Sequence, residues 1–350
     1  MLKVGVIGVG SISEQHIKPY LANEQVELLA LSDINETRLI AKGALYGVTE
    51  LYSDYRELLK NEAIDAVSIC TWNNAHAEIA IAALEAGKHV LVEKPLSMTV
   101  EEAEAVEAAV EKTGKVLQVG FVRRHGDNAK LLKTFIDNDE LGEIYYAKTS
   151  CIRKLGNPGG WFSDQSRSGG GPLIDLGVHM IDICWYFMGK PRPVSVSGNT
   201  YNKLGNRSNI KNLSFYKAAD YDPHLSDVED LTNAIIRFEN GASILVDVSY
   251  TLHAKQDELY VKLFGEKGGA EIEPELAIVA EKYNTILNVT PQIDNLSFDF
   301  EKAFQNEINH FVSSCLDGTE NIAPVSDGVQ VMKMLNAIYE SAKTGKEVYL

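Results

Sequence analysis

The sequence is poor in cysteine, and it has no long apolar run. Its 350 residues include four widely separated cysteines with neither metal-ligand nor redox spacing: Cys70, Cys151, Cys184 and Cys315. We interpret them as buried thiols. No apolar stretch is long enough to span a bilayer, and Met1 leads straight into the first apolar segment without a charged leader or a cleavage site. These absences predict a cytoplasmic protein that is neither secreted nor inserted in a membrane.

Positive charge is also scarce. The 33 lysines and arginines are outnumbered by 49 aspartates and glutamates, which gives a formal net charge of −16. This balance argues against nucleic acid or an anionic membrane as the main partner, while a local basic site could still bind phosphate. Because 45% of the residues are hydrophobic, a chain of 350 residues can build two domains with cores of their own.

The first third of the chain alternates apolar runs with helical patterns. Strands are expected near 2–8, 26–32, 64–70, 89–93 and 116–121, with helices near 11–22, 36–46, 75–86 and 99–113. Parallel strands need crossover connections, which these helices supply. The pattern predicts an α/β domain with a doubly wound parallel sheet.

The remainder of the chain has a different texture. Helices are expected near 127–137, 172–188, 301–316 and 327–343, with a strand at 143–153 and several later strands joined by turns. Asn240-Gly241 is a strong hairpin signal, and we expect Gly268-Gly269 to turn the next pair. The pattern predicts an α+β domain with a mostly antiparallel open sheet, and the last helices pack on it or back on the first domain. The polar segment 201–230 is long for a connection, so it is a mobile loop or a functional insertion.

A glycine turn follows the first strand. Gly8 would allow a tight turn, and Gly10 would let the backbone approach a pyrophosphate. The N–H groups near Ser11 and Ile12, at the start of the next helix, would then face the anion. Ser13 stands where the dinucleotide-binding fingerprint has its third glycine. By itself the segment is equally compatible with an ordinary strand, turn and helix.

An acidic residue ends the second strand. Asp33 lies twenty positions after Ser13, where dinucleotide-binding folds place the carboxylate that receives the ribose 2′-OH. Its other reading is a helix N-cap, and the two roles are compatible. Asp33 would repel a 2′-phosphate, so NAD is the expected cofactor. NADP stays possible because Arg38 and Lys42 follow.

A lysine lies at the carboxyl end of a predicted parallel strand, in the run Glu93-Lys94-Pro95. Ligands of open α/β sheets bind at this edge. Lys94 could bind a substrate hydroxyl and favour the developing oxygen charge, while Glu93 could orient it or contact the cofactor. A solvated lysine at a strand end is the alternative when the motif is taken alone.

Three polar residues share one face of the helix expected after a glycine-rich stretch. Asp175, His179 and Asp182 are spaced by four and three residues. Histidine exchanges protons near neutral pH, and a nearby carboxylate can set its tautomer and raise its basicity. A satisfied core histidine is the alternative. No other residue completes a ligand set with this trio, so we expect no metal site.

In their order along the chain, these motifs resemble the Gfo/Idh/MocA oxidoreductase family. The resemblance includes residues 8–10, Asp33, residues 93–95, residues 120–124 and residues 169–182, and it covers essentially the whole chain. It implies a Rossmann domain over 1–122 and a substrate-binding and oligomerisation domain over 123–350, in a homodimer or homotetramer. The implied reaction is NAD(P)-dependent hydride transfer at a secondary alcohol carbon of a sugar, inositol or related polyol.

The resemblance also implies roles for individual residues. The catalytic positions are Lys94, Asp175 and His179, with His179 as the acid/base. The cofactor-side positions are Thr71, Asn73, His76, Glu93 and Lys94, with Trp161 reaching the nicotinamide end. Trp72 departs from the family pattern, which commonly has proline there, and we interpret Asp182 as structural.

Substrate contacts are harder to assign. Arg123 and Arg124 are either anion or substrate contacts or structural pairs. Pocket-shaping candidates are Tyr145, Arg153, Lys154 and the segments 156–171 and 201–230. Two other functions fit the same sequence. One is a glycosidase that retains NAD and oxidises its sugar transiently, and the other is a non-catalytic sensor of a nucleotide or sugar.

Overall fold

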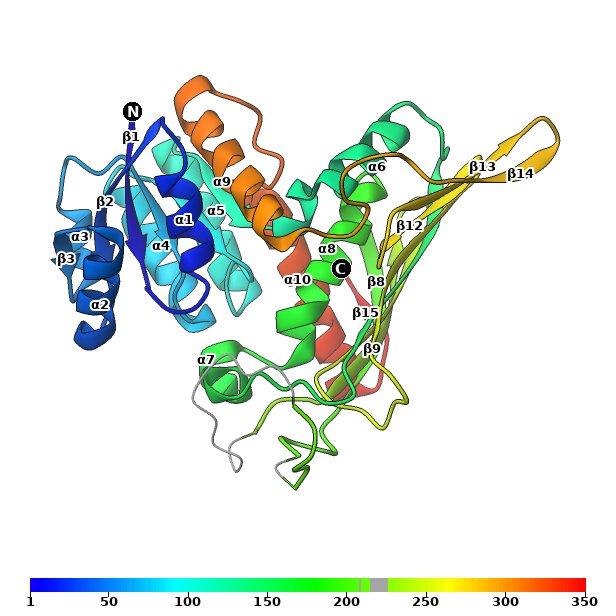
Figure 1. Ribbon diagram of the computed structural model, residues 1–350. Helices are drawn as coiled ribbons and strands as arrows, with labels where there is room; N and C mark the ends of the chain where they lie inside the picture. Colours follow the sequence, from blue (N-terminus) through cyan, green and yellow to red (C-terminus); the bar gives the residue numbers. More distant parts are fainter. Residues whose placement is uncertain (208, 215–225) are drawn as a thin grey trace. The chain divides into compact units, whose positions relative to one another are not determined.

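A computed structural model describes residues 1–207, 209–214 and 226–350. The chain divides into two compact units, which are coloured along the sequence in Figure 1. Unit 1 contains residues 1–122 and 300–332, and unit 2 contains residues 123–299 and 333–350.

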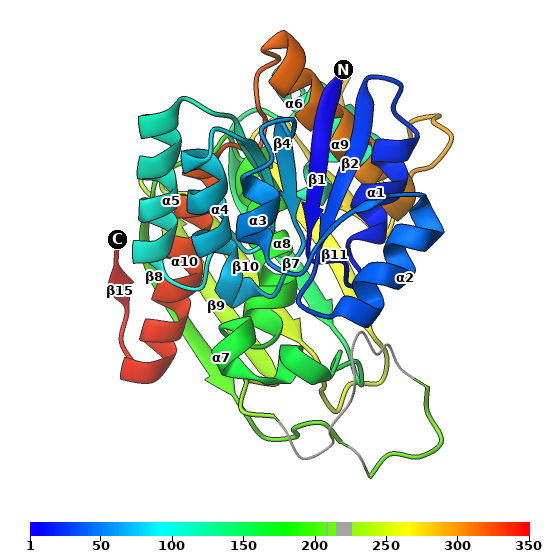
Figure 2. The ribbon, with the colours of Figure 1, turned by 90° about the vertical axis from the view of Figure 1, so that its left-hand side faces the viewer.

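Unit 1 is built on a parallel sheet (Figure 2). Its six strands are ordered β3-β2-β1-β4-β5-β6, and every paired strand runs parallel to its neighbour. The strands are β1 (Leu2–Ile7), β2 (Val26–Ser32), β3 (Glu50–Tyr52), β4 (Ala66–Ile69), β5 (His89–Glu93) and β6 (Leu117–Gly120). This order is that of a doubly wound dinucleotide-binding sheet, so the predicted fold class is confirmed. The sequence reading missed β3 and the short α3 (Tyr55–Leu59), whose patterns span too few residues to show a period.

Helices cover this sheet on both faces because the crossovers from β1 and from β4 proceed in opposite directions along it. They are α1 (Glu14–Leu21), α2 (Glu36–Tyr46), α4 (His76–Glu85), α5 (Val100–Thr113) and α9 (Phe300–Asp317). From α9, Ile308, Phe311 and Val312 enter the same buried cluster as Val4 of β1 and Ile17 of α1. Burying a side chain of this size contributes roughly 1.5–3 kcal/mol. Residues 300–332 therefore group with unit 1, although they follow the second domain in the sequence.

Unit 2 is built on a nine-stranded sheet, ordered β14-β13-β12-β11-β7-β10-β9-β8-β15. Only β7 and β10 pair in parallel, so the expected mostly antiparallel sheet is confirmed. The strands are β7 (Ile144–Ile152), β8 (Pro193–Tyr201), β9 (Leu231–Phe238), β10 (Ser243–Ser249), β11 (Glu258–Gly265), β12 (Gly268–Glu273), β13 (Ala277–Lys282), β14 (Thr285–Val289) and β15 (Val348–Tyr349).

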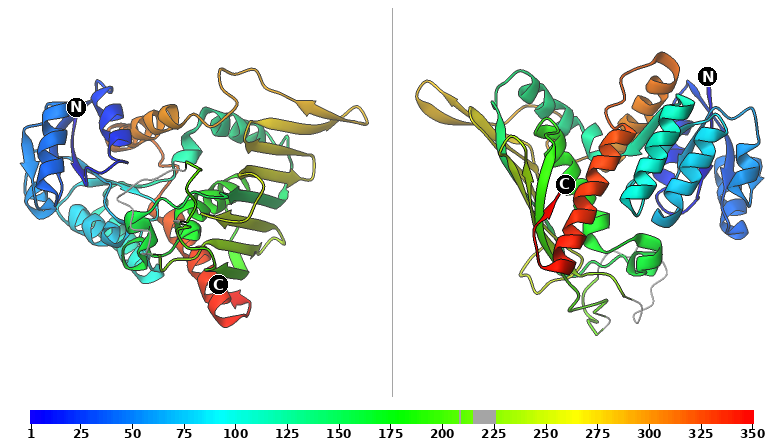
Figure 3. Two further views of the ribbon diagram at one scale, coloured as in Figure 1. Left: turned by 60° about the horizontal axis from the view of Figure 1, so that its bottom comes forward. Right: turned by 180° about the vertical axis from the view of Figure 1, so that it is seen from behind.

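The longer helices of unit 2 lie on one face of this sheet, as two views in Figure 3 show. They are α6 (Asp127–Asp137), α8 (Val178–Phe187) and the second half of α10 (Val325–Thr344). A short α7 (Gln165–Ser168) lies between α6 and α8 in the chain, just before the glycine-rich stretch. Helix α8 packs on β7, β10 and β11, the middle of the sheet. Among the described residues, no helix is both long and apolar enough to cross a membrane.

The two turn predictions for unit 2 have different outcomes. Asn240-Gly241 joins β9 to β10 in an antiparallel pair, with Gly241 at φ +85°, so the hairpin is confirmed. The prediction that Gly268-Gly269 forms a turn is wrong, because both glycines belong to β12. A Cβ on Gly268 would lie 2.6 Å from the carbonyl oxygen of Val279. These glycines therefore permit a close approach of strands rather than a reversal.

Candidate functional site

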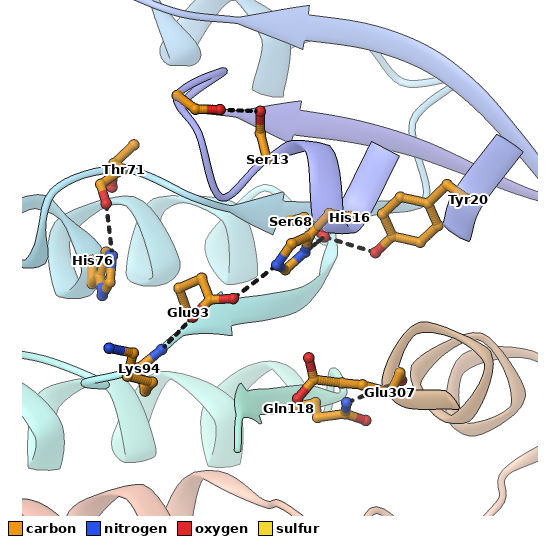
Figure 4. Close-up of polar contacts among 11 residues, drawn as sticks. Ser13, His16, Tyr20, Ser68, Thr71, His76, Glu93, Lys94, Gln118 and Glu307 are labelled. Carbon is orange, nitrogen blue, oxygen red and sulfur yellow. Dashed lines mark hydrogen bonds and ion pairs between the residues drawn. The ribbon is translucent and has the colours of Figure 1, made fainter. Parts of the chain in front are cut away.

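The glycine turn of unit 1 has the backbone that a bound pyrophosphate needs. Gly8 has φ +86°, and a Cβ there would lie 2.7 Å from the carbonyl oxygen of Cys70, so only glycine fits. At Gly10, a Cβ would meet nothing within 4 Å among the described residues, so this backbone is open to a ligand. The Ser13 hydroxyl donates a 2.7 Å hydrogen bond to the Gly10 carbonyl (Figure 4). Serine at the third fingerprint position thus closes the turn.

Asp33 is fixed next to this turn. Its Oδ2 accepts the Val9 N–H at 2.8 Å, and its Oδ1 accepts the Asn35 N–H at 2.8 Å. Because a carboxylate oxygen has two lone pairs, each still has a site for a ribose hydroxyl. The N-cap of α2 is Asn35, which accepts the Arg38 N–H at 3.0 Å. Asn35, and not Asp33, is therefore the cap of α2, and the Asp33 carboxylate is held beside the glycine turn.

Two cations on α2, Arg38 and Lys42, were the residues that left NADP binding open in the sequence. The Arg38 guanidinium lies 3.7 Å from Oδ2 of Asp33 and is half exposed, whereas Lys42 forms an ion pair with Glu14. Arg38 is thus the cation beside the ribose carboxylate. The turn and the anchored acid together fit the adenosine half of NAD.

The loop after β4 tolerates its unusual tryptophan. Trp72 has φ −72° and ψ 153°, and proline fixes φ near the same value. The backbone therefore keeps the conformation that the family's proline would impose. Asn73 is buried at the start of a short 3-10 turn, and Thr71 is half-buried beside it.

His76 corrects one expectation. The imidazole is buried, its Nδ1 lies 2.7 Å from the Pro95 carbonyl, and its Nε2 lies 3.2 Å from the Thr71 carbonyl. Burial lowers its pKa, so the ring is neutral at pH 7 and its single N–H donates to Pro95 across the shorter contact. Because this side chain links two loops of the protein, we no longer assign it to cofactor contact.

Glu93 and Lys94 follow one another at the end of β5. Glu93 is buried, and its Oε2 accepts the Lys94 backbone N–H at 3.2 Å (Figure 4). Its Oε1 lies 2.9 Å from Nε2 of His16, a residue that sequence reasoning missed. The available signal was a histidine on the apolar face of α1, one turn before Tyr20. Lys94 itself is half-buried.

In unit 2, Asp175 and His179 are each half-buried on an otherwise buried segment. All residues from Gly171 to Met180 except these two are buried. The helix is not continuous as predicted, because a π-helical turn (Leu173–Gly177) precedes α8. Such turns occur frequently at functional sites, since the wider turn re-aims a side chain. The structure therefore leaves an acid and a histidine, four residues apart, partly accessible on this segment.

A buried glutamate holds the start of this segment, and sequence reasoning missed it. Glu229 accepts the N–H groups of Gly171 and Leu173 at 2.9 and 3.1 Å, and the Tyr339 hydroxyl at 2.9 Å. Burial raises the pKa of Glu229. A carboxylate at a helix N-terminus satisfies amides that have no partner within the helix. Its signal was hidden because it lies 58 residues from Gly171, inside the polar segment 201–230.

The Asp175 charge acts on two buried groups of unit 2, the Tyr250 hydroxyl and the Cys151 thiol. Burial raises the pKa of the Tyr250 hydroxyl well above its usual range, and the Asp175 charge raises it further. Arg153 acts on Tyr250 in the opposite direction and also on Cys151, whose pKa burial raises. Arg153 and Asp175 thus act on the same two buried groups with opposite effect, and the Arg153 side chain donates to the Gly156 carbonyl at 3.0 Å. Lys154 is fixed through its backbone N–H, which donates to Asp257 at 3.0 Å.

The expectation of a substrate contact at Arg124 is corrected. Its side chain is 0% exposed and forms an ion pair with Asp182, which is 1% exposed. Two guanidinium contacts go to this carboxylate, one of them from Nε at 3.1 Å, and the guanidinium also lies 4.7 Å from the centroid of the Tyr186 ring. A buried arginine held in this way has a structural role, as does Asp182. Arg123 is also ion-paired, with Glu273, and it stacks over Phe298 at 4.8 Å.

The loop before the glycine-rich stretch has internal order. Trp161 stacks on Phe162, with ring centroids 3.9 Å apart. Asn157 donates to Asn206 at 2.7 Å and accepts from the Ser163 hydroxyl at 2.9 Å, which joins this loop to the segment 201–230. Positions 208 and 215–225 of that segment lie outside the described residues. Among those that are described, no group of three or more histidine, cysteine or acidic side chains could hold a metal ion.

Comparisons with known proteins match both parts of the chain to one family. Residues 2–121 match the model of an oxidoreductase family with an NAD-binding Rossmann fold, and residues 133–350 match the C-terminal α/β domain of that family. The chain is 31% identical to D-glucoside 3-dehydrogenase of Escherichia coli, over 100% of this chain and 97% of that protein. It is 38% identical to inositol 2-dehydrogenase of Salmonella typhimurium, over 98% and 95%.

A solved structure extends the likeness to the fold. Levoglucosan dehydrogenase in complex with NADH and levoglucosan has a TM-score of 0.85 and 25% identity, over 99% of both chains. The chain is thus an NAD-dependent oxidoreductase that acts on CH–OH groups. It belongs to the Gfo/Idh/MocA family, as the matches to both of that family's domains show.

Proposed function

We propose that this protein transfers a hydride reversibly between NAD and a secondary alcohol carbon of a cyclic sugar, inositol or related polyol. The observation that carries the proposal is the partial exposure of both Asp175 and His179 on a segment whose other residues, from Gly171 to Met180, are buried. Relatives named for glucoside 3- and inositol 2-dehydrogenation support a ring hydroxyl as the reacting group.

The proposal gives each catalytic residue a role. In the oxidising direction, His179 accepts the hydroxyl proton, and Asp175 orients the imidazole or the sugar. Lys94 stabilises the substrate oxygen through its positive charge. Bound NAD would supply the hydride acceptor.

NAD would be held by the glycine turn and by residues at the ends of the strands. The proposed contacts on the adenosine side are Gly8, Gly10, Ser11, Ile12 and Asp33. Those on the nicotinamide side are Thr71, Asn73, Glu93, Lys94 and Trp161. The anchoring of Asp33 through Val9 supports the first set, because the ribose acid and the pyrophosphate turn are fixed to each other.

On the substrate side, Arg153 is the best supported contact. It shares the electrostatic environment of Asp175 and Tyr250, where a guanidinium could bind sugar hydroxyls. We retain Lys154 and Arg123 as weaker candidates, and Arg123 would have to leave Glu273 to contact a ligand.

We further propose a cytoplasmic homodimer or homotetramer. All four cysteines are free thiols, which fits a reducing compartment. The resemblance to the family supports the oligomer. The relatives reported above are named as dehydrogenases, and neither an NAD-retaining glycosidase nor a sensor gains support from them.

The proposed function is tested by NADH absorbance with a panel of inositols, aldoses and glucosides. Lys94→Ala and His179→Ala should each lower kcat by about 10²–10⁴-fold. NADH affinity measured by fluorescence should stay near the wild-type value in His179→Ala and should change far less than kcat in Lys94→Ala, which also removes one proposed cofactor contact. Lys112→Ala and His253→Ala are matched controls, since Lys112 forms an exposed ion pair and His253 is exposed. Wild-type turnover in both catalytic variants would contradict the assignment.

A further inference from the structure

A chain of buried hydrogen bonds crosses unit 1 and ends at Glu93, the residue before Lys94 (Figure 4). Tyr20 and His16 come from α1, Ser68 from β4 and Glu93 from β5. The Tyr20 hydroxyl lies 2.7 Å from Ser68 Oγ, and Ser68 Oγ lies 3.2 Å from His16 Nδ1. His16 Nε2 then lies 2.9 Å from Glu93 Oε1. The His16 and Tyr20 side chains are fully buried.

Donor counting assigns a direction to this chain. An ionised Glu93 can only accept, so Nε2 of His16 carries a proton and donates it. In a neutral imidazole, Nδ1 is then an acceptor for the Ser68 hydroxyl, and Ser68 Oγ accepts from Tyr20. Each donor has an acceptor in this arrangement. An imidazolium would instead donate to Ser68 from Nδ1, turn the Ser68 hydroxyl toward the Tyr20 oxygen, and leave the Tyr20 proton without an acceptor in the chain.

Glu93 transmits this arrangement to the backbone of Lys94. One carboxylate oxygen accepts from His16, and the other accepts the Lys94 N–H at 3.2 Å. The carboxylate also packs on β6, because a Cβ at Gly120 would lie 3.3 Å from Glu93 Oε2. With both oxygens bound and no space beside it, Glu93 fixes where Lys94 leaves the strand.

We propose that His16 is a positioning residue for Lys94, acting through Glu93. The inference rests on the proposed function, in which Lys94 touches the reacting oxygen. His16 lies in the first turn of α1, the helix that begins just after the glycine turn. One buried side chain therefore joins the proposed pyrophosphate-binding helix to the proposed catalytic lysine. Binding at one end and lysine placement at the other are coupled through it.

Two amide substitutions separate the two ends of the imidazole. In His16→Gln, the amide nitrogen takes the place of Nε2 and still donates to Glu93. In His16→Asn, the shorter amide takes the place of Nδ1, so it retains Ser68 and loses Glu93. Tyr20→Phe is the matched control, because it removes a hydroxyl at the far end of the chain and retains the ring.

The kinetic expectation follows from the loss of lysine placement. His16→Asn should lower kcat by about 10²-fold, as a displacement of about 1 Å at a reacting group can do, with NADH affinity changed far less. His16→Gln should recover most of kcat, and Tyr20→Phe should match the wild type. Equal kcat losses in the Asn and Gln variants would refute the positioning role and indicate a packing role.

A second readout does not require turnover. In hydrogen exchange followed by mass spectrometry, His16→Asn should speed exchange in the peptide that contains residues 93–97, because the Lys94 amide loses a fixed acceptor. Strand β1 should keep its wild-type rate, and Tyr20→Phe should change neither. Unchanged exchange at 93–97, or equal acceleration in β1, would overturn the proposal. If the wild type turns over no panel substrate while the exchange pattern is as expected, the proposed function fails and the His16 link stands.

Discussion

The buried ion pair between Arg124 and Asp182 offers a sharp test of the assignments in unit 2. The variant Asp182→Ala would remove the carboxylate that pairs with the Arg124 guanidinium, whose side chain is 0% exposed. Removing one partner of such a pair costs about 3–5 kcal/mol, because the remaining charge stays buried and loses its counter-charge. The cost is a large fraction of the roughly 5–15 kcal/mol that stabilises a typical domain.

Urea unfolding followed by tryptophan fluorescence measures this cost. Two of the three tryptophans, Trp161 and Trp185, belong to unit 2. Trp185 is buried on α8, the helix that also carries Asp182. With a denaturant slope near 3 kcal/mol per molar, Asp182→Ala should lower the midpoint of the unit 2 transition by about 1–2 M. Arg192→Ala is the matched control in the same unit, since Arg192 forms an ion pair that is half exposed, and it should cost at most about 1 kcal/mol.

A double variant separates structure from substrate binding. Arg124→Met with Asp182→Leu replaces the pair by apolar side chains and should restore most of the lost stability. If Arg124 has no contact with substrate, this variant should also retain the wild-type KM. A midpoint shift no larger than that of Arg192→Ala would refute the reasoning about burial. Restored stability with a strongly raised KM would return Arg124 to the substrate site.

Two further predictions concern unit 1. Asp33→Ala should weaken NADH binding by about 10-fold or more, as the loss of a charged hydrogen-bond partner does, and should weaken NADPH binding less; fluorescence titration measures both, and equal losses would contradict ribose recognition by Asp33. Burial lowers the pKa of His76 below 6.5 in the folded protein, so the unfolded chain binds the proton more tightly. Stability from neutral His76 is therefore full above pH 6.5 and is lost as the pH falls through the folded pKa. When melting temperature is plotted against pH, His76→Gln should flatten the curve below pH 6.5. An unchanged slope would show that His76 does not cause the loss of stability there.

Local patterns in the sequence determined much of this protein. Alternating apolar runs and helical periods predicted the doubly wound sheet, and Asn240-Gly241 predicted a hairpin, because both depend on residues that are neighbours in the chain. The glycine turn, Asp33, Lys94 and the Asp175–His179 spacing were likewise visible, since each motif lies within a few residues of one strand end or helix turn.

Only the tertiary structure decided what these motifs touch. Glu93 meets His16 across 77 residues, and Gly171 meets Glu229 across 58, so no local pattern announces either contact. The same holds for α9. Its apolar face does not reveal which unit it packs on, and only the structure places Ile308 and Phe311 in the core of unit 1. The sequence left Arg124 open between an anion contact and a structural pair, and the fold decided for the pair with Asp182, because burial and partner choice depend on the whole structure. The sequence by itself determined which chemical groups stand at the strand ends, and folding over long separations determined which of them are held, paired or left accessible.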